Sequence, residues 1–469
     1  MASVLIVSAA QHTYSPTMTK TRLTFLGSLA FAAAQQVGNY QNETHPKLQW
    51  SKCAADGGYQ QISGELVMDA NLRWLHKVDD WRSCFADGQW DYKVCNSVEN
   101  CTANCAIEGA EYSYVYGVKS GNDSVSQQLV TKFDFSQNVG SRIFVSASKD
   151  KYQMFTLLNN ELAFDVDLST VECGINAALH FVAMDEDGGM SRYPGNKAGA
   201  EYGTGYCDSS CPRSLKFVAG KANTEMWFPS ETDPVAGAGL LGACCSEFAV
   251  WNSNAHSFSM SSHICPRDDY QVCYGKDCDA WWIEPGERYN ARCDFWGCGY
   301  NPYRLGATDF YGKGKKVDTS RKFTVVTQFG NTNVTQFFIQ NGTRIDMPDP
   351  TLEGLPEHNG LTPEICAKSS ALFNEPDRFG LNGGWQKHLK MLSRPMVLSM
   401  SISDDHYYHN LWLDSTYPID QTDHPVPGTV RGDCLMDDND PQVVENMYPN
   451  AKVVWSNIRF GPIGSTVKV

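Results

Sequence analysis

The sequence is short of positive charge and of long hydrophobic runs. Its 469 residues include 38 Lys or Arg against 53 Asp or Glu, which gives a net charge of −15. A phosphate backbone needs a basic surface, so this balance excludes nucleic acid as the partner. No apolar stretch is long enough to cross a bilayer, which excludes a membrane-spanning protein. An acidic surface instead favours solubility and neutral or cationic partners.

The 17 cysteines lack the spacing of a metal site. No CxxC pair occurs and histidines are not interleaved with the cysteines, so neither a metal nor a cofactor is indicated. The cysteines come instead as scattered close pairs, such as Cys95/Cys101 and Cys207/Cys211. This usage predicts disulfides formed in an oxidising compartment, and the odd count leaves one thiol over.

Residues 1–34 predict export. A basic start at 18–22, an apolar run at 23–32 and small residues up to Ala34 match a secretory signal peptide. We expect translation to begin at Met18 and the mature, extracellular chain to begin at Gln35. Four N-x-S/T sequons are then predicted surface glycosylation sites: Asn42, Asn122, Asn333 and Asn341.

Helical periodicity is also scarce, with 385–392 as the best short candidate. Period-two alternation predicts strands over 163–168, 322–329, 395–402 and 452–460. Turn clusters such as Asn341-Gly342 separate these runs. Strands without long intervening helices predict an all-β fold of two packed antiparallel sheets. No linker, repeat or low-complexity tract divides residues 35–469, which we expect to form a single domain.

Short sequence blocks spread in order over nearly all of residues 40–465 carry a family resemblance. They include Glu43-Thr-His-Pro46, Cys173-Gly-Ile-Asn176, the run from Gly199 to Asp208, Asn301-Pro-Tyr-Arg-Leu-Gly306 and the run from Leu411 to Pro418. With them the chain resembles the cellobiohydrolase-like cellulases of glycoside hydrolase family 7. The resemblance implies a curved β-jelly-roll sandwich, monomeric, whose long loops cover a cleft for a cellulose or related β-glucan chain. No separate carbohydrate-binding module is expected.

The resemblance also pairs sixteen of the cysteines. The implied disulfides are Cys84–Cys105, Cys95–Cys101, Cys173–Cys434, Cys207–Cys245, Cys211–Cys244, Cys265–Cys293, Cys273–Cys278 and Cys298–Cys366. Cys53 is left alone and is expected to be a buried, inert thiol. The stretches Trp227–Ala243 and Cys278–Cys298 keep the length found in cellobiohydrolases, which implies a covered, tunnel-like cleft.

The catalytic segment of the family has the form E-x-D-x-W-E, and here the matching residues are Glu247-Phe-Ala-Val-Trp-Asn252. Glu247 takes the place of the nucleophile, Ala249 that of a supporting Asp, and Asn252 that of the acid/base. Residues 247 and 249 share one face of a strand, but residue 252 needs a bulge or a strand end to join them. An amide supplies no acid near neutral pH, so hydrolysis is expected to be lost or strongly impaired.

The glycan-binding residues implied by the resemblance are only partly retained. Those that match are Trp74, Arg142, Asn176, Tyr206, Asp208, Lys216, His263, Arg288, Trp412 and Arg431. Leu72 and Ser403 stand where the family stacks sugars on tryptophan, and four further contact positions differ: His180, Ser210, Trp296 and Gly299.

Three hypotheses for function remain open. The first is a secreted β-1,4-glucan-binding protein with impaired hydrolysis. The second is an active cellobiohydrolase or β-glucanase that uses Glu247 with a relocated acid, for which Asp208, His256 and His263 are candidates, although His256 better fits a surface loop. The third is a secreted structural or partner-binding protein without affinity for glycan.

Overall fold

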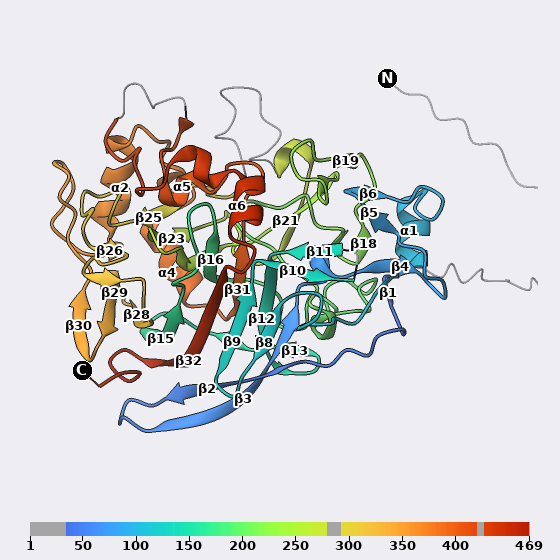
Figure 1. The fold of residues 1–469 in the computed structure, drawn as a ribbon, viewed down its shortest axis with the longest axis horizontal. Coiled ribbons are helices and arrows are strands. Elements are labelled where there is room, and N and C mark those ends of the chain that lie inside the picture. The colour runs from blue at the N-terminus through green and yellow to red at the C-terminus, as the bar shows by residue number, and fades with distance from the viewer. Residues whose placement is uncertain (1–33, 135, 279–291, 420–425, 469) are drawn as a thin grey trace, which may run out of the picture. The chain divides into compact units, whose positions relative to one another are not determined.

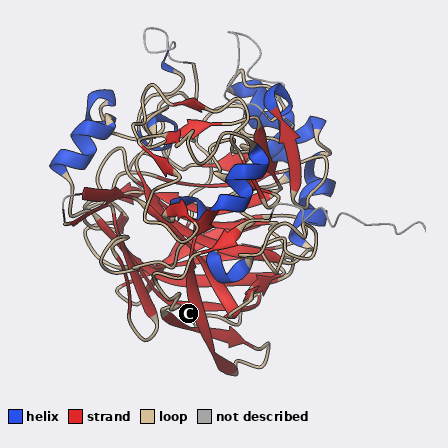
Figure 2. Cartoon of the chain, turned by 90° about the vertical axis from the view of Figure 1, so that its right-hand side faces the viewer, coloured by secondary structure: helices blue, strands red, loops and turns tan. Residues whose placement is uncertain are grey.

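The computed structural model describes residues 34–134, 136–278, 292–419 and 426–468. The predicted leader lies outside these residues, apart from Ala34. Strands dominate the described chain (Figure 1, Figure 2), which confirms the predicted all-β class. No helix in this part of the chain is long and apolar enough to span a membrane.

Two runs of hydrogen-bonded strands build the sandwich. The first run follows the order β2 (Lys47–Cys53), β3 (Tyr59–Met68), β12 (Ser141–Ser148), β31 (Met396–Ser403), β16 (Asn176–Val182), β22 (Glu247–Ser253), β23 (Phe258–His263) and β25 (Cys298–Tyr300). The second follows the order β8 (Val118–Ser120), β9 (Ser124–Gln128), β32 (Lys452–Pro462), β15 (Asn160–Asp167), β28 (Phe323–Phe329), β29 (Val334–Gln340) and β30 (Thr343–Asp346). All these neighbours are antiparallel, and a short parallel pairing of β2 with β32 joins the two runs.

The core lies between these two runs of strands. Phe248 and Trp251 of β22 are fully buried. Phe248 meets Phe329 of β28 with ring centroids 5.3 Å apart, and Trp251 meets Phe338 of β29 at 5.9 Å. Alternate residues of each strand therefore fill the interior, as the period-two pattern predicted.

The turn and helix predictions also hold. Asn341 and Gly342 both have positive φ, 53° and 75°, and close the β29–β30 hairpin as such dipeptides do. The helix expected at 385–392 is α4 (Gly384–Leu392). The other α-helices of the described residues are α1 (Val98–Asn104), α2 (Pro363–Leu372), α3 (Arg378–Leu381), α5 (Leu411–Asp414) and α6 (Pro441–Met447). Short 3-10 helices are η1 (Ala70–Leu72), η2 (Ala200–Tyr202), η3 (Gly275–Asp277) and η5 (Met436–Asn439).

The other described strands are short. They are β1 (Gln36–Val37), β4 (Leu75–Lys77), β5 (Phe85–Ala86), β6 (Gln89–Trp90), β7 (Cys105–Ile107), β10 (Val130–Phe133), β11 (Ser136–Val139), β13 (Lys151–Tyr152), β14 (Met154–Phe155), β17 (Phe217–Val218), β18 (Lys221–Ala222), β19 (Phe228–Pro229), β20 (Gly237–Ala238), β21 (Leu241–Cys244), β24 (Gln271–Tyr274), β26 (Tyr311–Gly312) and β27 (Val317–Asp318). Strands β19 and β20 pair within the long stretch Trp227–Ala243. The other long stretch, Cys278–Cys298, falls partly outside the described residues.

All eight expected disulfides are formed. Two of them connect one loop to the residues just before β22. Cys207 is bonded to Cys245, and Cys211 is bonded to Cys244. Cys53 is the free cysteine and is buried, as expected. The disulfides therefore hold the loop after Tyr206 against the strand that carries the catalytic segment.

Candidate active site

Strand β22 forms the floor of a cleft with a cavity of about 250 Å³. Glu247, Ala249 and Asn252 all line this cavity. Ala249 and Asn252 are three residues apart, yet their partners on β23, Ser261 and Ser259, are two apart. This extra residue is a β-bulge, and the register shifts against β16 at the same point. The bulge turns Asn252 onto the face of Glu247, as the spacing required.

Hydrogen bonds hold the Asn252 amide in one orientation. The backbone N–H of Ser253 donates to Asn176 Oδ1 at 3.1 Å, which leaves Asn176 Nδ2 to donate to Asn252 Oδ1 at 3.0 Å. His180 Nε2 donates to the same oxygen at 2.8 Å. Asn252 is buried. Its amide oxygen accepts two hydrogen bonds, and an amide has no carboxyl proton to give.

Glu247 is held as a carboxylate. Ser209 Oγ donates to Glu247 Oε1 at 2.8 Å, and His180 Nδ1 lies 3.6 Å from Oε2. Burial alone raises the pKa of Glu247, but the His180 imidazole, the charge of His263 and the Ser209 hydroxyl together lower it to about 2. Oε2 is buried and accepts no hydrogen bond from any described residue.

His180, named from the sequence only as an altered contact position, lies beside both Asn252 and Glu247. It pairs across the strands with Ala249, where a small side chain leaves room for the imidazole to lie between Glu247 and Asn252. Burial lowers the pKa of His180, but the Glu247 carboxylate outweighs burial and raises it overall. One signal was present in the sequence: His180 is four residues from Asn176, and an even spacing on a strand places both on one face.

A second acidic group lies beside Glu247. Asp208 lines the cleft and accepts a hydrogen bond from the Tyr206 hydroxyl at 2.7 Å. Burial and the neighbouring Glu247 carboxylate raise the pKa of Asp208. Arg142 stands behind this pair, its guanidinium 3.5 Å from the centroid of the Tyr206 ring, and donates to Asp69 at 2.7 Å. Arg142 therefore supports Tyr206 rather than lining the cavity.

Three further predicted residues lie in the cleft wall: His263, Trp412 and Arg431. His263 Nδ1 donates to the carbonyl of Asp294 at 3.1 Å, and its Nε2 lies 2.6 Å from Ser261 Oγ. Arg431 donates to Glu375 at 3.1 Å. Each polar side chain is thus fixed by a partner.

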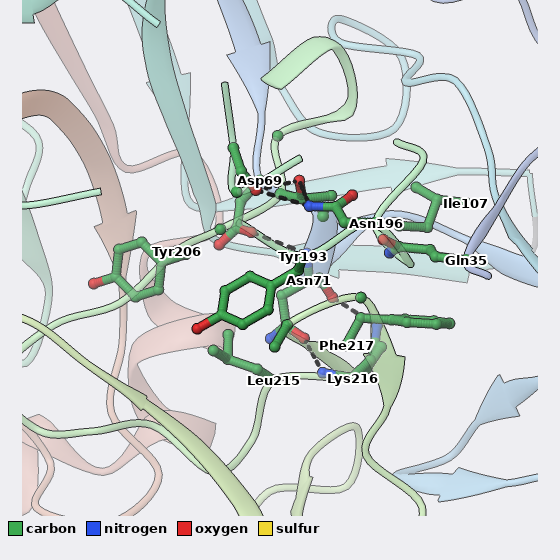
Figure 3. Close-up of a pocket in the computed structure, with 18 of the residues that line it drawn as sticks. Gln35, Asp69, Asn71, Ile107, Tyr193, Asn196, Tyr206, Leu215, Lys216 and Phe217 are labelled. Atoms are coloured by element: carbon green, nitrogen blue, oxygen red, sulfur yellow. Dashed lines mark hydrogen bonds between the residues drawn. The ribbon is translucent and has the colours of Figure 1, made fainter. Parts of the chain in front are cut away.

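Two further predicted residues, Lys216 and Trp74, lie away from this cavity. Lys216 lines a separate small pocket, where its Nζ donates to the carbonyl of Asn71 at 2.7 Å (Figure 3). Trp74 belongs to an aromatic cluster with Tyr40 and the exposed Trp81. Arg288 lies outside the described residues.

His256 is excluded as a relocated acid by its position. It does not line the cavity, and its two ring nitrogens face Glu172 at 3.1 Å and Asp433 at 3.0 Å. It is a partly exposed ion-pair residue, as the surface-loop alternative expected.

The two-sheet sandwich, with a carboxylate, polar groups and a tryptophan in one cleft, has the features that the resemblance to the glycoside hydrolases implied. The family model described as Glycosyl hydrolase family 7 matches residues 37–467. The chain therefore belongs to glycoside hydrolase family 7.

Solved structures agree with this assignment. A cellobiohydrolase from Melanocarpus albomyces, in complex with cellotetraose, is 51% identical, with TM-score 0.89 and coverage of 93% of this chain and 100% of that one. A family 7 cellobiohydrolase from Daphnia pulex is 39% identical, with TM-score 0.89 and coverage of 92% and 100%. The Humicola insolens endocellulase EGI is 29% identical, with TM-score 0.76 and coverage of 92% and 100%.

Proposed function

We propose that the protein is a secreted, monomeric β-1,4-glucan-binding protein whose retaining hydrolysis is lost or strongly impaired. The observation that carries the proposal is the buried Asn252 amide, held by Asn176 and His180 on the face of Glu247. Retaining hydrolysis needs one carboxyl group to attack the anomeric carbon and another to protonate the leaving oxygen and then activate water. Glu247 supplies the first group, and an amide cannot supply the second.

The missing acid affects both chemical steps. General acid–base catalysis contributes roughly 10²–10⁴-fold per step, and a sugar hydroxyl is a poor leaving group without protonation. Even if Glu247 attacks, the glycosyl–enzyme ester then waits for a water that no base activates. Ala249 adds a further loss, because it removes the carboxylate that the family motif places beside the nucleophile.

The rest of the cleft supports binding. Trp412 offers a flat apolar face, and Asn176, Asp208, His263 and Arg431 offer fixed polar groups around the same cavity. A related cellobiohydrolase has been solved with cellotetraose. The greater likeness to cellobiohydrolases than to an endocellulase favours a covered cleft that encloses a chain.

One observation favours an alternative, hydrolysis with a relocated acid. His180 Nε2 lies 2.8 Å from the Asn252 oxygen and its Nδ1 lies 3.6 Å from Glu247. An imidazolium held there carries a proton next to the position that the acid occupies in the family motif. Under this alternative His180 would protonate the leaving oxygen, and its neutral form would activate water.

Hydrolysis of an aryl β-cellobioside, together with calorimetric binding of cellotetraose, tests the proposal. The activated leaving group needs little protonation, so the assay isolates what Glu247 still does. We expect cellotetraose to bind and aryl release to stop after at most one equivalent. Steady turnover that Glu247→Gln and His180→Gln both abolish would establish the alternative instead. Absence of binding would overturn the glycan-binding role.

A further inference from the structure

Three side chains with metal-ligating atoms converge outside the cleft cavity. Asp404 and His406 follow strand β31, and Glu445 lies on helix α6. His406 Nε2 is 3.4 Å from Glu445 Oε1 and 3.6 Å from Asp404 Oδ2, and the three ligand atoms all lie within 4.8 Å of one another. Ligands bound tetrahedrally at zinc distances stand about 3.3–3.6 Å apart, so two of these separations already fit a shared ion.

Outer partners orient the ligands. His406 Nδ1 donates to the backbone carbonyl of Thr232 at 3.1 Å. Nε2 is therefore the ring nitrogen that faces both carboxylates. Gln137 Nε2 donates to the other oxygen of Glu445, Oε2, at 3.2 Å. A backbone carbonyl behind a histidine and a hydrogen bond behind a carboxylate are the arrangement that orients ligands in metal sites.

The carboxylate of Asp404 adds an independent observation. Its side chain is only 9% exposed, and its Oδ2, which faces His406, accepts no hydrogen bond from any described residue. A buried carboxylate oxygen without a donor is unfavourable, and here it lies beside a second carboxylate. A cation between them would satisfy the orphan oxygen, the second carboxylate and the imidazole lone pair together.

We propose that Asp404, His406 and Glu445 bind one divalent transition-metal ion, with Zn²⁺ as the best match. One imidazole nitrogen and two carboxylate oxygens suit zinc better than magnesium or calcium, which prefer all-oxygen sites. Water would complete a tetrahedral shell on the exposed side. The site is independent of the glycan chemistry at Glu247.

The ion would join segments that are distant in sequence. It would connect the loop after β31 to α6 and, through His406, to the Thr232 segment of the long stretch Trp227–Ala243. Tyr408 and Trp412, which follow His406 along the chain, line the glycan cleft. Metal binding would therefore stiffen one cleft wall, and it should raise the melting temperature in proportion to the logarithm of free metal.

The chain contains a matched control. His256 also contacts two carboxylates, Glu172 and Asp433, at 3.1 Å and 3.0 Å. These carboxylates face opposite ring nitrogens, so they cannot converge on one ion. A zinc effect that arises from histidine–carboxylate charge alone would depend on His256 as much as on His406.

The test is calorimetric titration of ZnCl₂ into full-length, tag-free protein stripped with a chelator, with Co²⁺ absorption as a second readout. We expect one ion per chain, a cobalt spectrum of four-coordinate type, and affinity reduced at least about tenfold in His406→Gln and Glu445→Gln. His256→Gln should bind like wild type, and melting in chelator shows whether each variant is folded. Absence of saturable one-to-one binding, or equal binding by wild type and folded His406→Gln, would overturn the proposal.

Discussion

The two faces of strand β22 differ in what their side chains contact. The inward face carries Phe248 and Trp251, fully buried against aromatic rings of the other sheet. The outward face carries Glu247, Ala249 and Asn252, which line the cleft cavity. The inward face determines packing and the outward face determines chemistry. The packing role and the chemical role of this strand therefore belong to different residues.

Hydrogen bonds stabilise the buried amide on the outward face. Asn252 is as buried as a core residue, yet its amide oxygen accepts bonds from Asn176 and His180. Buried polar groups cost little when their hydrogen bonds are made. The altered cleft floor is thus a satisfied polar network rather than a defect in the fold.

The largest expected effect comes from restoring the outward face. We predict that Ala249→Asp/Asn252→Glu raises steady-state release from an aryl β-cellobioside by roughly 10²–10⁴-fold, because a carboxyl group again activates water for the second step. The measurement is turnover after the first equivalent. Adding Glu247→Gln should abolish the gain, and an unchanged rate in the double variant would contradict the comparison.

The inward face should show the reverse behaviour. We predict that Trp251→Ala lowers the free energy of unfolding by about 3–5 kcal/mol, because it empties a buried aromatic site. Asn252→Asp should change it far less. Urea denaturation monitored by fluorescence measures both. If Asn252→Asp destabilised the protein as much as Trp251→Ala, the two faces would not differ in their contribution to stability.

Replacing His180 tests the polar network on the outward face. The pKa of Glu247 is lowered from 4.5 to about 2, so the folded state binds this proton less readily than the unfolded state. That stability is present above pH 4.5 and is lost as the pH falls towards 2. We predict that His180→Gln removes most of this dependence, a difference of roughly 2–3 kcal/mol at pH 5.

Unfolding of both proteins from pH 6 to pH 2 measures this difference. Wild type should lose stability more steeply than His180→Gln in the acid window. Ser253→Ala, on the same strand as Glu247, serves as a control, because its hydroxyl donates to the carbonyl of Ala177 rather than to a partner of Glu247. Parallel curves for wild type and His180→Gln would show that the imidazole does not hold the carboxylate.

Sequence patterns predicted the scaffold better than the site. Alternating runs located β15, β28, β31 and β32, and the family resemblance located every disulfide of the described chain. Helix α2 was missed, although Thr362 and Pro363 form an ordinary N-terminal cap signal. Short helices on loops depend on tertiary packing, which period counting does not detect.

The contact between His180 and Asn252 could not be predicted because it depends on register. Their strands are far apart in sequence, and a bulge without any glycine or proline signal near Val250 turns Asn252 onto the cleft face. A one-residue change of register moves a side chain to the other face. The candidates for a relocated acid therefore omitted His180, which is the histidine in contact with both catalytic positions.

The smallest effect is expected at His256, which lies on the surface away from both faces. Burial lowers its pKa, but Asp433 and Glu172 raise it from 6.5 to about 9. A raised folded pKa contributes stability below pH 6.5 that is lost as the pH rises through about 9. The side chain is 25% exposed, so screening limits the contribution to about 1 kcal/mol or less.

We predict that His256→Gln removes this decline between pH 6.5 and pH 9 without changing glycan binding, as urea unfolding and cellotetraose calorimetry would measure. A decline of equal slope in the variant would assign the dependence to other groups.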